Sequence, residues 1–261
     1  MRHALRRAGI VTATLLAGAA VTVAVTVAVT GQAFAVAHGT PVPDGRYRFA
    51  VKLTMTNIPR PDGTHYNSAC SAALVAPRWI LTAGHCFHDV NRVPVSGPVP
   101  YPTTATVGRT DLSDHDGHVL NVVEVRQATG TDIALARLDH AVYDVAPLRL
   151  STSTPTAGEV LRITGWGATD SVNPVPVTHL QTGQMTVSSV ASTTLGVRGF
   201  KPSSDTSACL YDSGAPYFVE RDGHAPELVS IESDGPDCPH HLEETTSRVD
   251  NIVNWIRRII R

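Results

Sequence analysis

Three short segments carry side chains that together could cleave an acyl bond. His85 lies beside a cysteine at the end of an apolar run, Asp132 precedes another apolar run, and Ser213 stands in an Asp-Ser-Gly turn. A serine hydroxyl is a poor nucleophile near neutral pH, so a histidine must accept its proton and a buried carboxylate must hold the imidazole in the right tautomer. We therefore predict Ser213 as nucleophile, His85 as general base and Asp132 as the acid that orients His85. Each residue also has a simpler interpretation: a structural histidine, a turn-capping aspartate and an ordinary turn serine.

The segments that must position these side chains are short and rich in β-branched residues. Such runs recur at residues 50–53, 72–75, 79–81, 121–125, 133–138, 160–163 and 228–231, separated by Gly, Pro, Asn and Asp clusters. Many short strands at this spacing indicate an all-β sandwich or barrel. The polar stretch 151–156 is a candidate linker between two halves.

The C-terminus follows a different pattern. Val249, Ile252, Val253, Ile256 and Ile260 recur at helical spacing. This predicts an amphipathic helix from about residue 249, which packs its apolar stripe on the body of the protein. A helix at a membrane surface is the alternative.

The composition is that of an ordinary globular protein. The chain has 261 residues, of which 42% are hydrophobic and 17% charged, so wholesale disorder is excluded and a sizeable core is expected. The formal net charge is −2, which leaves no basic excess for binding nucleic acid.

The first 35 residues have the pattern of a secretory signal peptide. Arg2, Arg6 and Arg7 precede a long run without charged residues, and Ala33-Phe34-Ala35 is a small-x-small cleavage pattern. We predict export with cleavage after Ala35, so that the protein is extracellular. A retained membrane anchor through residues 8–29 is the alternative.

Export affects the interpretation of the four cysteines, which all follow Ala35. An even number of cysteines in an exported chain predicts two disulfides, and three pairings are open. A zinc site is the rival interpretation, but the spacings are not those of a ribbon or finger. The four are Cys70, Cys86, Cys209 and Cys238.

Taken in order along the chain, these segments resemble the chymotrypsin/trypsin-like serine protease family, and look like its actinobacterial exported branch. The order His, Asp, Ser is that of the family. The resemblance extends to Gly165-Trp166-Gly167, to Ser230-Ile231-Glu232 and to Asn254-Trp255-Ile256. An α/β-hydrolase is excluded, because Ser213 is not in a Gly-x-Ser-x-Gly elbow and the order of the three residues differs.

The resemblance implies an all-β fold of two antiparallel β-barrels, with the active site in the cleft between them, and a C-terminal α-helix. It assigns residues 36–150 to the N-terminal barrel with His85 and Asp132, and residues 151–248 to the C-terminal barrel with Ser213. Residues 249–261 form the helix. It also implies the disulfide pairs Cys70–Cys86 and Cys209–Cys238.

Two further roles come from the resemblance. A new α-ammonium at Val36 would pair with Asp212 and shape the oxyanion hole, although Ala37 and His38 depart from the family pattern; the alternative is that Asp212 only braces the turn. The oxyanion donors would be the backbone N–H groups of Tyr211 and Ser213.

Tyr211 stands where glycine is common, and losing one oxyanion donor costs roughly 100- to 1000-fold in rate. Because all three catalytic residue types are present, the chain is expected to be an active endopeptidase. The alternative, which Tyr211 favours, is an impaired homologue that acts as a binding module.

The specificity pocket is expected to have Ser207 at its floor, Ser230 and Glu232 along one wall and Glu244 on the opposite wall. A carboxylate inside the pocket would attract a basic side chain, whereas one across the mouth would narrow it. We predict a basic residue before the cleaved bond; the alternative is that both glutamates face solvent.

The expected partners are protein or peptide substrates, with proteinaceous inhibitors as further candidates, and the protein is expected to be a monomer. No cofactor and no metal is expected. Residues 114–118 (Asp-His-Asp-Gly-His) carry metal-ligand types at close range, but a solvated loop is the preferred interpretation.

Overall fold

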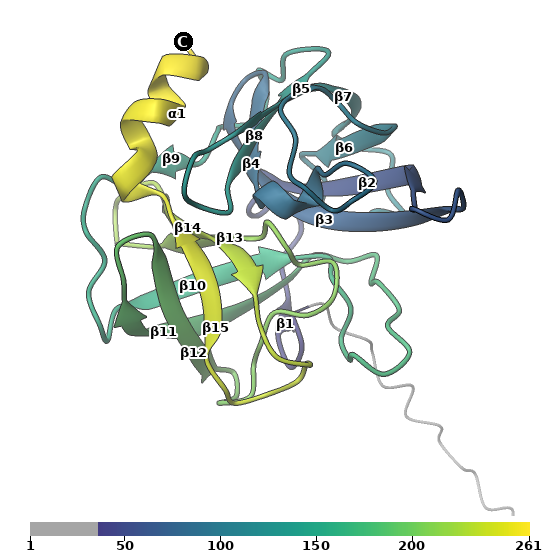
Figure 1. Ribbon diagram of the computed structural model, residues 1–261. Coiled ribbons are helices and arrows are strands. Elements are labelled where there is room, and N and C mark those ends of the chain that lie inside the picture. Colours follow the sequence, from purple (N-terminus) through teal and green to yellow (C-terminus); the bar gives the residue numbers. More distant parts are fainter. Residues whose placement is uncertain (1–35) are drawn as a thin grey trace, which may run out of the picture. The chain divides into compact units, whose positions relative to one another are not determined.

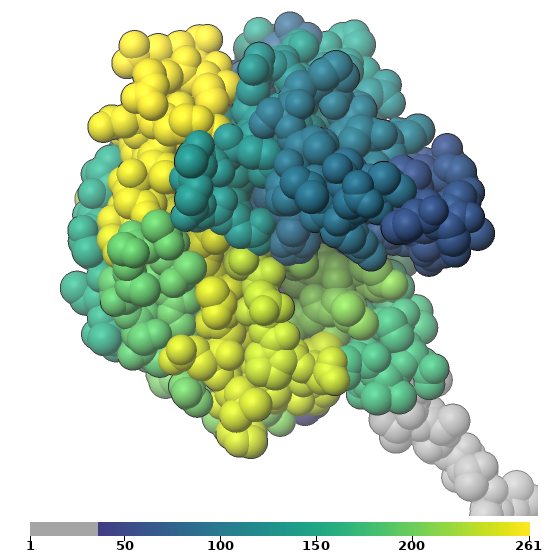
Figure 2. All heavy atoms as spheres, viewed as in Figure 1, coloured from purple at the N-terminus to yellow at the C-terminus, as the bar shows by residue number. Residues whose placement is uncertain are grey.

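The computed structural model describes residues 36–261, and the expected signal peptide lies outside the described residues. Two β-sheets dominate this part of the chain, and each closes on itself into a barrel (Figure 1). The space-filling view shows the two barrels packed directly against each other (Figure 2).

The first barrel comes from the first half of the chain. Its strands are β2 (Ala50–Pro59), β3 (His65–Ala76), β4 (Trp79–Thr82), β6 (Thr103–Val107), β7 (His118–Gln127) and β8 (Ala134–Leu138). They follow the order β6-β2-β3-β4-β8-β7, and the pairing of β7 with both β6 and β8 closes the ring. All pairings are antiparallel, and the short β5 (Gly97–Pro98) extends the edge of β7.

The second barrel repeats this design. Its strands are β10 (Val160–Gly165), β11 (Gln181–Val190), β12 (Thr194–Lys201), β13 (Pro216–Val219), β14 (Glu227–Asp234) and β15 (Glu244–Arg248). The order β11-β10-β13-β14-β15-β12 is closed by the antiparallel pairing of β11 with β12. The predicted fold class of two antiparallel barrels is confirmed.

Two short strands depart from the expected division of the chain at residue 150. β1 (Thr40–Pro41) pairs with β11, and β9 (Arg149–Leu150) runs parallel to β14, so both join the second sheet. β1 pairs with residues 181–182 of β11 and β9 with residues 227–228 of β14, at strand ends that β12 and β15 do not cover, so backbone groups on both sides find partners. Within residues 36–261, the first strand therefore joins the second barrel, and the strands of the first barrel follow it.

Buried apolar side chains fill both barrels and the contact between them. Ile80, Leu81 and Leu135 in β4 and β8 have no exposed surface, and each such side chain contributes about 1.5–3 kcal/mol of transfer free energy. Between the barrels, the Phe49 and Phe218 rings meet edge to face with centroids 5.2 Å apart. This contact is part of the apolar packing between the two barrels.

The C-terminal helix begins close to its predicted start. A 3-10 turn, η2 (Asp250–Ile252), leads into α1 (Val253–Ile259), and Val253 and Ile256 are buried against the large core cluster that includes the first barrel. No helix within residues 36–261 is long and apolar enough to cross a membrane.

Candidate active site

His85 and Asp132 meet because two paired strands end side by side. β4 leads into the 3-10 turn η1 (Gly84–Cys86), and β8 begins two residues after Asp132. Thr82 of β4 lies opposite Ala134 of β8, so the residues beyond these strand ends are neighbours. Asp132 Oδ2 is 2.8 Å from His85 Nδ1, and Asp132 Oδ1 accepts the His85 backbone N–H at 2.8 Å. One carboxylate thus fixes both the backbone and the ring of His85.

Ser233 is a further partner of Asp132 that was not predicted from the sequence. Its hydroxyl donates to Asp132 Oδ2 at 2.7 Å. Burial alone would raise the pKa of Asp132, but the hydrogen bonds and charge of His85 and the hydroxyl of Ser233 outweigh burial and lower this pKa. Asp132 therefore stays ionised at neutral pH. Because His85 Nδ1 is engaged, its Nε2 is free to accept a proton.

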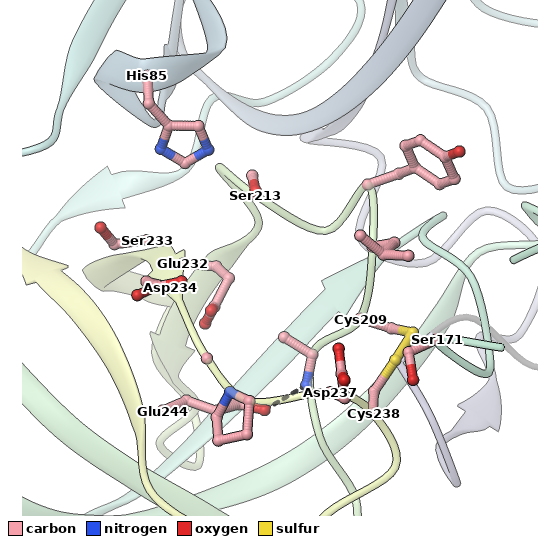
Figure 3. A pocket seen from close by; sticks show the side chains of 15 residues that line it. His85, Ser171, Cys209, Ser213, Glu232, Ser233, Asp234, Asp237, Cys238 and Glu244 are labelled. Carbon is pink, nitrogen blue, oxygen red and sulfur yellow. Dashed lines mark hydrogen bonds between the residues drawn. A yellow bond between two sulfur atoms is a disulfide. The ribbon is translucent and has the colours of Figure 1, made fainter. Parts of the chain in front are cut away.

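Ser213 stands in a turn that requires the glycine after it. Gly214 has a φ of +85°, and a Cβ there would clash with the Ser71 carbonyl and the Thr82 hydroxyl. The Ser213 carbonyl accepts the Ser71 N–H at 2.8 Å, which ties the turn to β3. Ser213 and His85 line the same cavity of about 210 Å³ (Figure 3). Within residues 36–261, no hydrogen bond joins the Ser213 hydroxyl to His85.

Two disulfides hold the segments that carry these side chains. Cys70 of β3 is bonded to Cys86, directly after His85, and Cys209, in the loop before Ser213, is bonded to Cys238. These are the pairs that the family resemblance implies. The loops of both His85 and Ser213 are thereby tethered.

Tyr211 adopts the left-handed backbone conformation that glycine takes easily. Its φ is +76°, which costs a residue with a side chain roughly 1–2 kcal/mol. The Leu210 carbonyl accepts the Ala168 N–H at 2.7 Å. Because the C=O and N–H of a trans peptide point in opposite directions, the Tyr211 N–H points away from Ala168. Within the described chain, the Tyr211 and Ser213 N–H groups have no protein acceptor.

Asp212 is a fully buried carboxylate with three backbone donors. It accepts the N–H groups of Gly167, Cys209 and Val36 at 2.8, 3.1 and 3.3 Å. A Cβ at Gly165 or Gly167 would clash with this carboxylate, which explains the Gly-Trp-Gly segment. Burial raises the pKa of Asp212 to about 6, although these hydrogen bonds oppose the rise. A positive charge near Asp212 would therefore stabilise its ionised form.

Lys52 is such a cation, and its role was not predicted from the sequence. It lies in β2 between Val51 and Leu53, is only 5% exposed, and donates from Nζ to the Trp166 carbonyl at 3.0 Å. Burial lowers the pKa of Lys52 to about 8, and the charge of Asp212 opposes that lowering. A lysine within an apolar strand was the signal available in the sequence.

The cavity beside Ser213 contains two of the expected specificity residues. Glu232 and Glu244 both line it and are 4% and 0% exposed, so the alternative that they face solvent is wrong. In Figure 3, Glu232 lies between Ser213 and Glu244 in the view. Both side chains are buried at the wall of the cavity, so neither carboxyl group lies across its mouth.

Ser230 does not line this cavity, contrary to expectation. It is fully buried, and its hydroxyl accepts the Thr246 hydroxyl at 2.8 Å. The Gly214 N–H donates to the Glu232 carbonyl at 2.9 Å, and this pairing places Ser233 at the cavity and next to Asp132. The serine of this strand that reaches the cavity is therefore Ser233, three residues after Ser230.

Ser207 is also displaced from the expected floor. Its hydroxyl accepts the His240 N–H at 3.4 Å, and the residue is fully buried outside the cavity lining. The Glu244 carboxylate occupies the floor instead, because its Oε1 accepts the Ala208 N–H at 2.6 Å. The acidic group at the floor of the pocket is therefore Glu244, in place of the expected Ser207.

Comparison with known proteins agrees with this architecture. A family model described as Trypsin matches residues 36–256. The chain is 29% identical over 217 residues to the alpha- and beta-fibrinogenase OhS1 of Ophiophagus hannah, covering 75% of this chain and 79% of that protein. It is 30% identical over 218 residues to the snake venom serine protease rhinocerase 4 of Bitis rhinoceros, covering 75% and 80%. It is 26% identical over 210 residues to the serine protease SP24D of Anopheles gambiae, covering 74% and 72%.

Proposed function

This chain belongs to the trypsin family of serine proteases, and we propose that it is an exported serine endopeptidase. Ser213 is the nucleophile, His85 is the general base and acid, and Asp132 orients His85. The reaction is hydrolysis of a peptide bond through an acyl-enzyme.

The proposed mechanism has two halves. Ser213 Oγ attacks the substrate carbonyl while His85 Nε2 takes the hydroxyl proton, and His85 then gives this proton to the leaving amine. A water molecule, activated by His85, hydrolyses the acyl-enzyme. The N–H groups of Tyr211 and Ser213 stabilise the oxyanion, and the Asp132 carboxylate stabilises the imidazolium.

The observation that carries this proposal is that Ser213 and His85 line one cavity while Asp132 contacts the His85 ring. The 2.8 Å contact between Asp132 Oδ2 and His85 Nδ1 leaves Nε2 available, and Ser213 lines the cavity that His85 also lines. The missing hydrogen bond between Ser213 and His85 is compatible with this role, because such contacts often tighten only when substrate binds.

A fluorophosphonate probe tests the proposal directly. The secreted protein should be labelled on Ser213, and Ser213→Ala and His85→Ala should each abolish labelling. Ser230→Ala is a matched control, because Ser230 is buried away from the cavity, and this variant should still be labelled. Labelling that survives in Ser213→Ala, or wild-type protein that is not labelled, would refute the proposal.

A catalytically impaired homologue that acts as a binding module is the second candidate. It is favoured by Tyr211, a tyrosine at a φ of +76° where the oxyanion donor must be aimed. Protein that is correctly folded but unlabelled by the probe would support this second function.

We further propose that the protein is exported, as in the actinobacterial exported branch, and that signal-peptide cleavage alone creates Val36 as the mature N-terminus. The supporting observation is that the Val36 nitrogen lies 3.3 Å from Asp212 Oδ2. Amino-terminal sequencing of the secreted protein tests this, and a start at any residue other than Val36 would refute it.

The proposed substrate carries a basic residue before the cleaved bond. Two carboxyl groups, those of Glu232 and Glu244, line the pocket beside Ser213, and a cationic side chain would complement them. A peptide panel that varies only this residue should show faster cleavage after Lys or Arg. Preference for Phe or Leu would refute this part of the proposal.

A further inference from the structure

Tyr217 joins the two carboxyl groups at the floor of the pocket. Its hydroxyl oxygen is 2.8 Å from Glu232 Oε2 and 2.7 Å from Glu244 Oε2, and all three residues are buried. Tyr217 lies on β13, Glu232 on β14 and Glu244 at the start of β15, three strands that are neighbours in the barrel. The sequence around Tyr217 carries no signal of such a role.

The hydrogen-bond inventory of this cluster requires an extra proton. A phenol has one O–H, so Tyr217 can donate to one carboxyl group only. The second short contact needs a donor from the other side, and an ionised carboxylate has none. Burial raises the pKa of Tyr217 well above its usual value, so the phenol keeps its own proton. One of the two carboxyl groups must therefore be protonated.

The proton is assigned to Glu232. Glu244 Oε1 accepts the Ala208 N–H at 2.6 Å, a bond that favours an ionised Glu244. Burial raises the pKa of Glu244 to about 7, and burial together with the charge of Glu244 raises that of Glu232 well above its usual value. The chain of donors thus runs from the Glu232 O–H to Tyr217 and from the Tyr217 O–H to Glu244.

Other titratable groups surround this cluster. His240 Nε2 is 3.4 Å from Glu244 Oε1, but burial lowers the pKa of His240, so it is neutral near pH 7. Asp234 and Asp237 also line the pocket. The charge of Asp212 contributes to the raised pKa of both Glu232 and Glu244. His85 is a further titratable group that lines the cavity, on the side of Ser213, and within residues 36–261 no Lys or Arg side chain lines it.

We propose that Glu232, Tyr217 and Glu244 form a proton-sharing floor that carries one negative charge and selects a cationic side chain, with Tyr217 as the positioning residue. This inference rests on the proposed function and names a residue that determines specificity. A cation binds the ionised floor better than the protonated floor, so its affinity rises with pH while Glu244 loses its proton. The rise is about tenfold per pH unit when one proton is released.

Benzamidine, a cation that cannot be hydrolysed, is the probe. Its Kd is measured by calorimetry on the secreted Ser213→Ala protein from pH 5 to pH 8.5, in two buffers of different ionisation enthalpy. We expect tighter binding as the pH rises towards about 7, with release of close to one proton below that pH. Binding that is independent of pH, or absent, would overturn the inference.

Three further variants, each made on the Ser213→Ala protein, test the separate roles of Tyr217, Glu244 and Glu232 in benzamidine binding. Tyr217→Phe removes the hydrogen bond that favours ionised Glu244, so the midpoint of the affinity curve should move to higher pH. Glu244→Gln removes the charge and should lower benzamidine affinity at pH 8 at least about tenfold. Glu232→Gln keeps an N–H donor for Tyr217, so affinity should change less than about threefold.

Tyr143→Phe is the matched control, because Tyr143 is 85% exposed and outside the cavity. Its affinity curve should coincide with that of the Ser213→Ala parent. A Tyr217→Phe curve with the same midpoint as this control would overturn the role of Tyr217, as would equal losses in the two glutamine variants. Thermal unfolding of each variant establishes that it is folded.

The assays separate two kinds of failure. Fluorophosphonate labelling of the wild type reports on Ser213, whereas benzamidine binding to Ser213→Ala reports on the pocket alone. Labelling without pH-dependent binding would overturn this inference and leave the proposed peptidase intact. Binding without labelling would support the floor and refute the peptidase.

Discussion

Lys52→Met should change how the stability of the protein depends on pH. Lys52 is 5% exposed, and burial lowers its pKa to about 8 from the 10.5 of a lysine in water. The folded state therefore binds this proton less tightly than the unfolded state. Between these two values the unfolded chain binds more protons, so the contribution of Lys52 to stability rises with pH in this window.

The size of the effect follows from the two pKa values. Each pKa unit corresponds to about 1.4 kcal/mol. Linkage with folded and unfolded values of about 8 and 10.5 gives a gain of about 2.5 kcal/mol for the wild type between pH 7 and pH 10. Methionine carries no proton, so the Lys52→Met variant lacks this gain. The difference in unfolding free energy between the two proteins should therefore change by about this amount.

Urea unfolding of the secreted protein and the variant at pH 7, 8, 9 and 10 measures this difference. Both proteins are made with the Ser213→Ala change to prevent self-cleavage. Lys201 is the other lysine of the chain and is exposed, so Lys201→Met is the matched control and should follow the wild type at every pH. Parallel curves for wild type and Lys52→Met would show that Lys52 is not a buried, destabilised cation.

Three further predictions concern the proposed catalytic groups. Asp132→Asn should lower kcat by about 10⁴-fold with little change in KM, because an amide holds His85 in the wrong tautomer; steady-state kinetics on a peptide ester would measure this. Tyr211→Gly should relieve about 1 kcal/mol of backbone strain and retain activity, and urea unfolding with fluorophosphonate labelling would check both. Ser233→Ala removes one hydrogen bond to Asp132 and should raise the pH at which activity falls on acidification, as measured by the pH profile of kcat/KM.

The barrels and the three reactive segments could be predicted because their signals are local. Short apolar runs separated by turn residues indicate strands, and the strings around His85, Asp132 and Ser213 carry their chemistry in a few neighbouring residues. The crossing of β1 to the second barrel was not predictable in this way. It depends on pairing between residues 40–41 and 181–182, which no local pattern encodes.

In the specificity pocket, too, the positions of single residues depend on long-range contacts that the local sequence does not predict. Ser230 and Ser233 both belong to the strand that reaches the site, and the local sequence does not distinguish them. Their places depend on the long-range bond between the Gly214 N–H and the Glu232 carbonyl. Tyr217 lies in an apolar strand and resembles any core tyrosine until the structure brings two glutamates to its hydroxyl.

Asp212 lies next to both the Val36 nitrogen, which becomes the amino terminus on the proposed cleavage, and the buried Lys52. In an uncleaved chain the Val36 nitrogen is an amide, so Lys52 is the cation that acts on Asp212. The proposed cleavage would add an ammonium 3.3 Å from Asp212 Oδ2. Two cations would then share one buried carboxylate, and either could keep it ionised.

This sharing predicts that the two cations are coupled. A secreted form with one extra alanine before Val36 should lose part of its activity, and Lys52→Met alone should lose little. The two changes together should cost more than the sum of the separate losses in free energy, because no cation then remains beside Asp212. The rate of fluorophosphonate labelling in all four forms gives this double-mutant cycle. Additive losses would mean that Lys52 does not act on Asp212, and that the ordering of the Ser213 turn depends on the amino terminus alone.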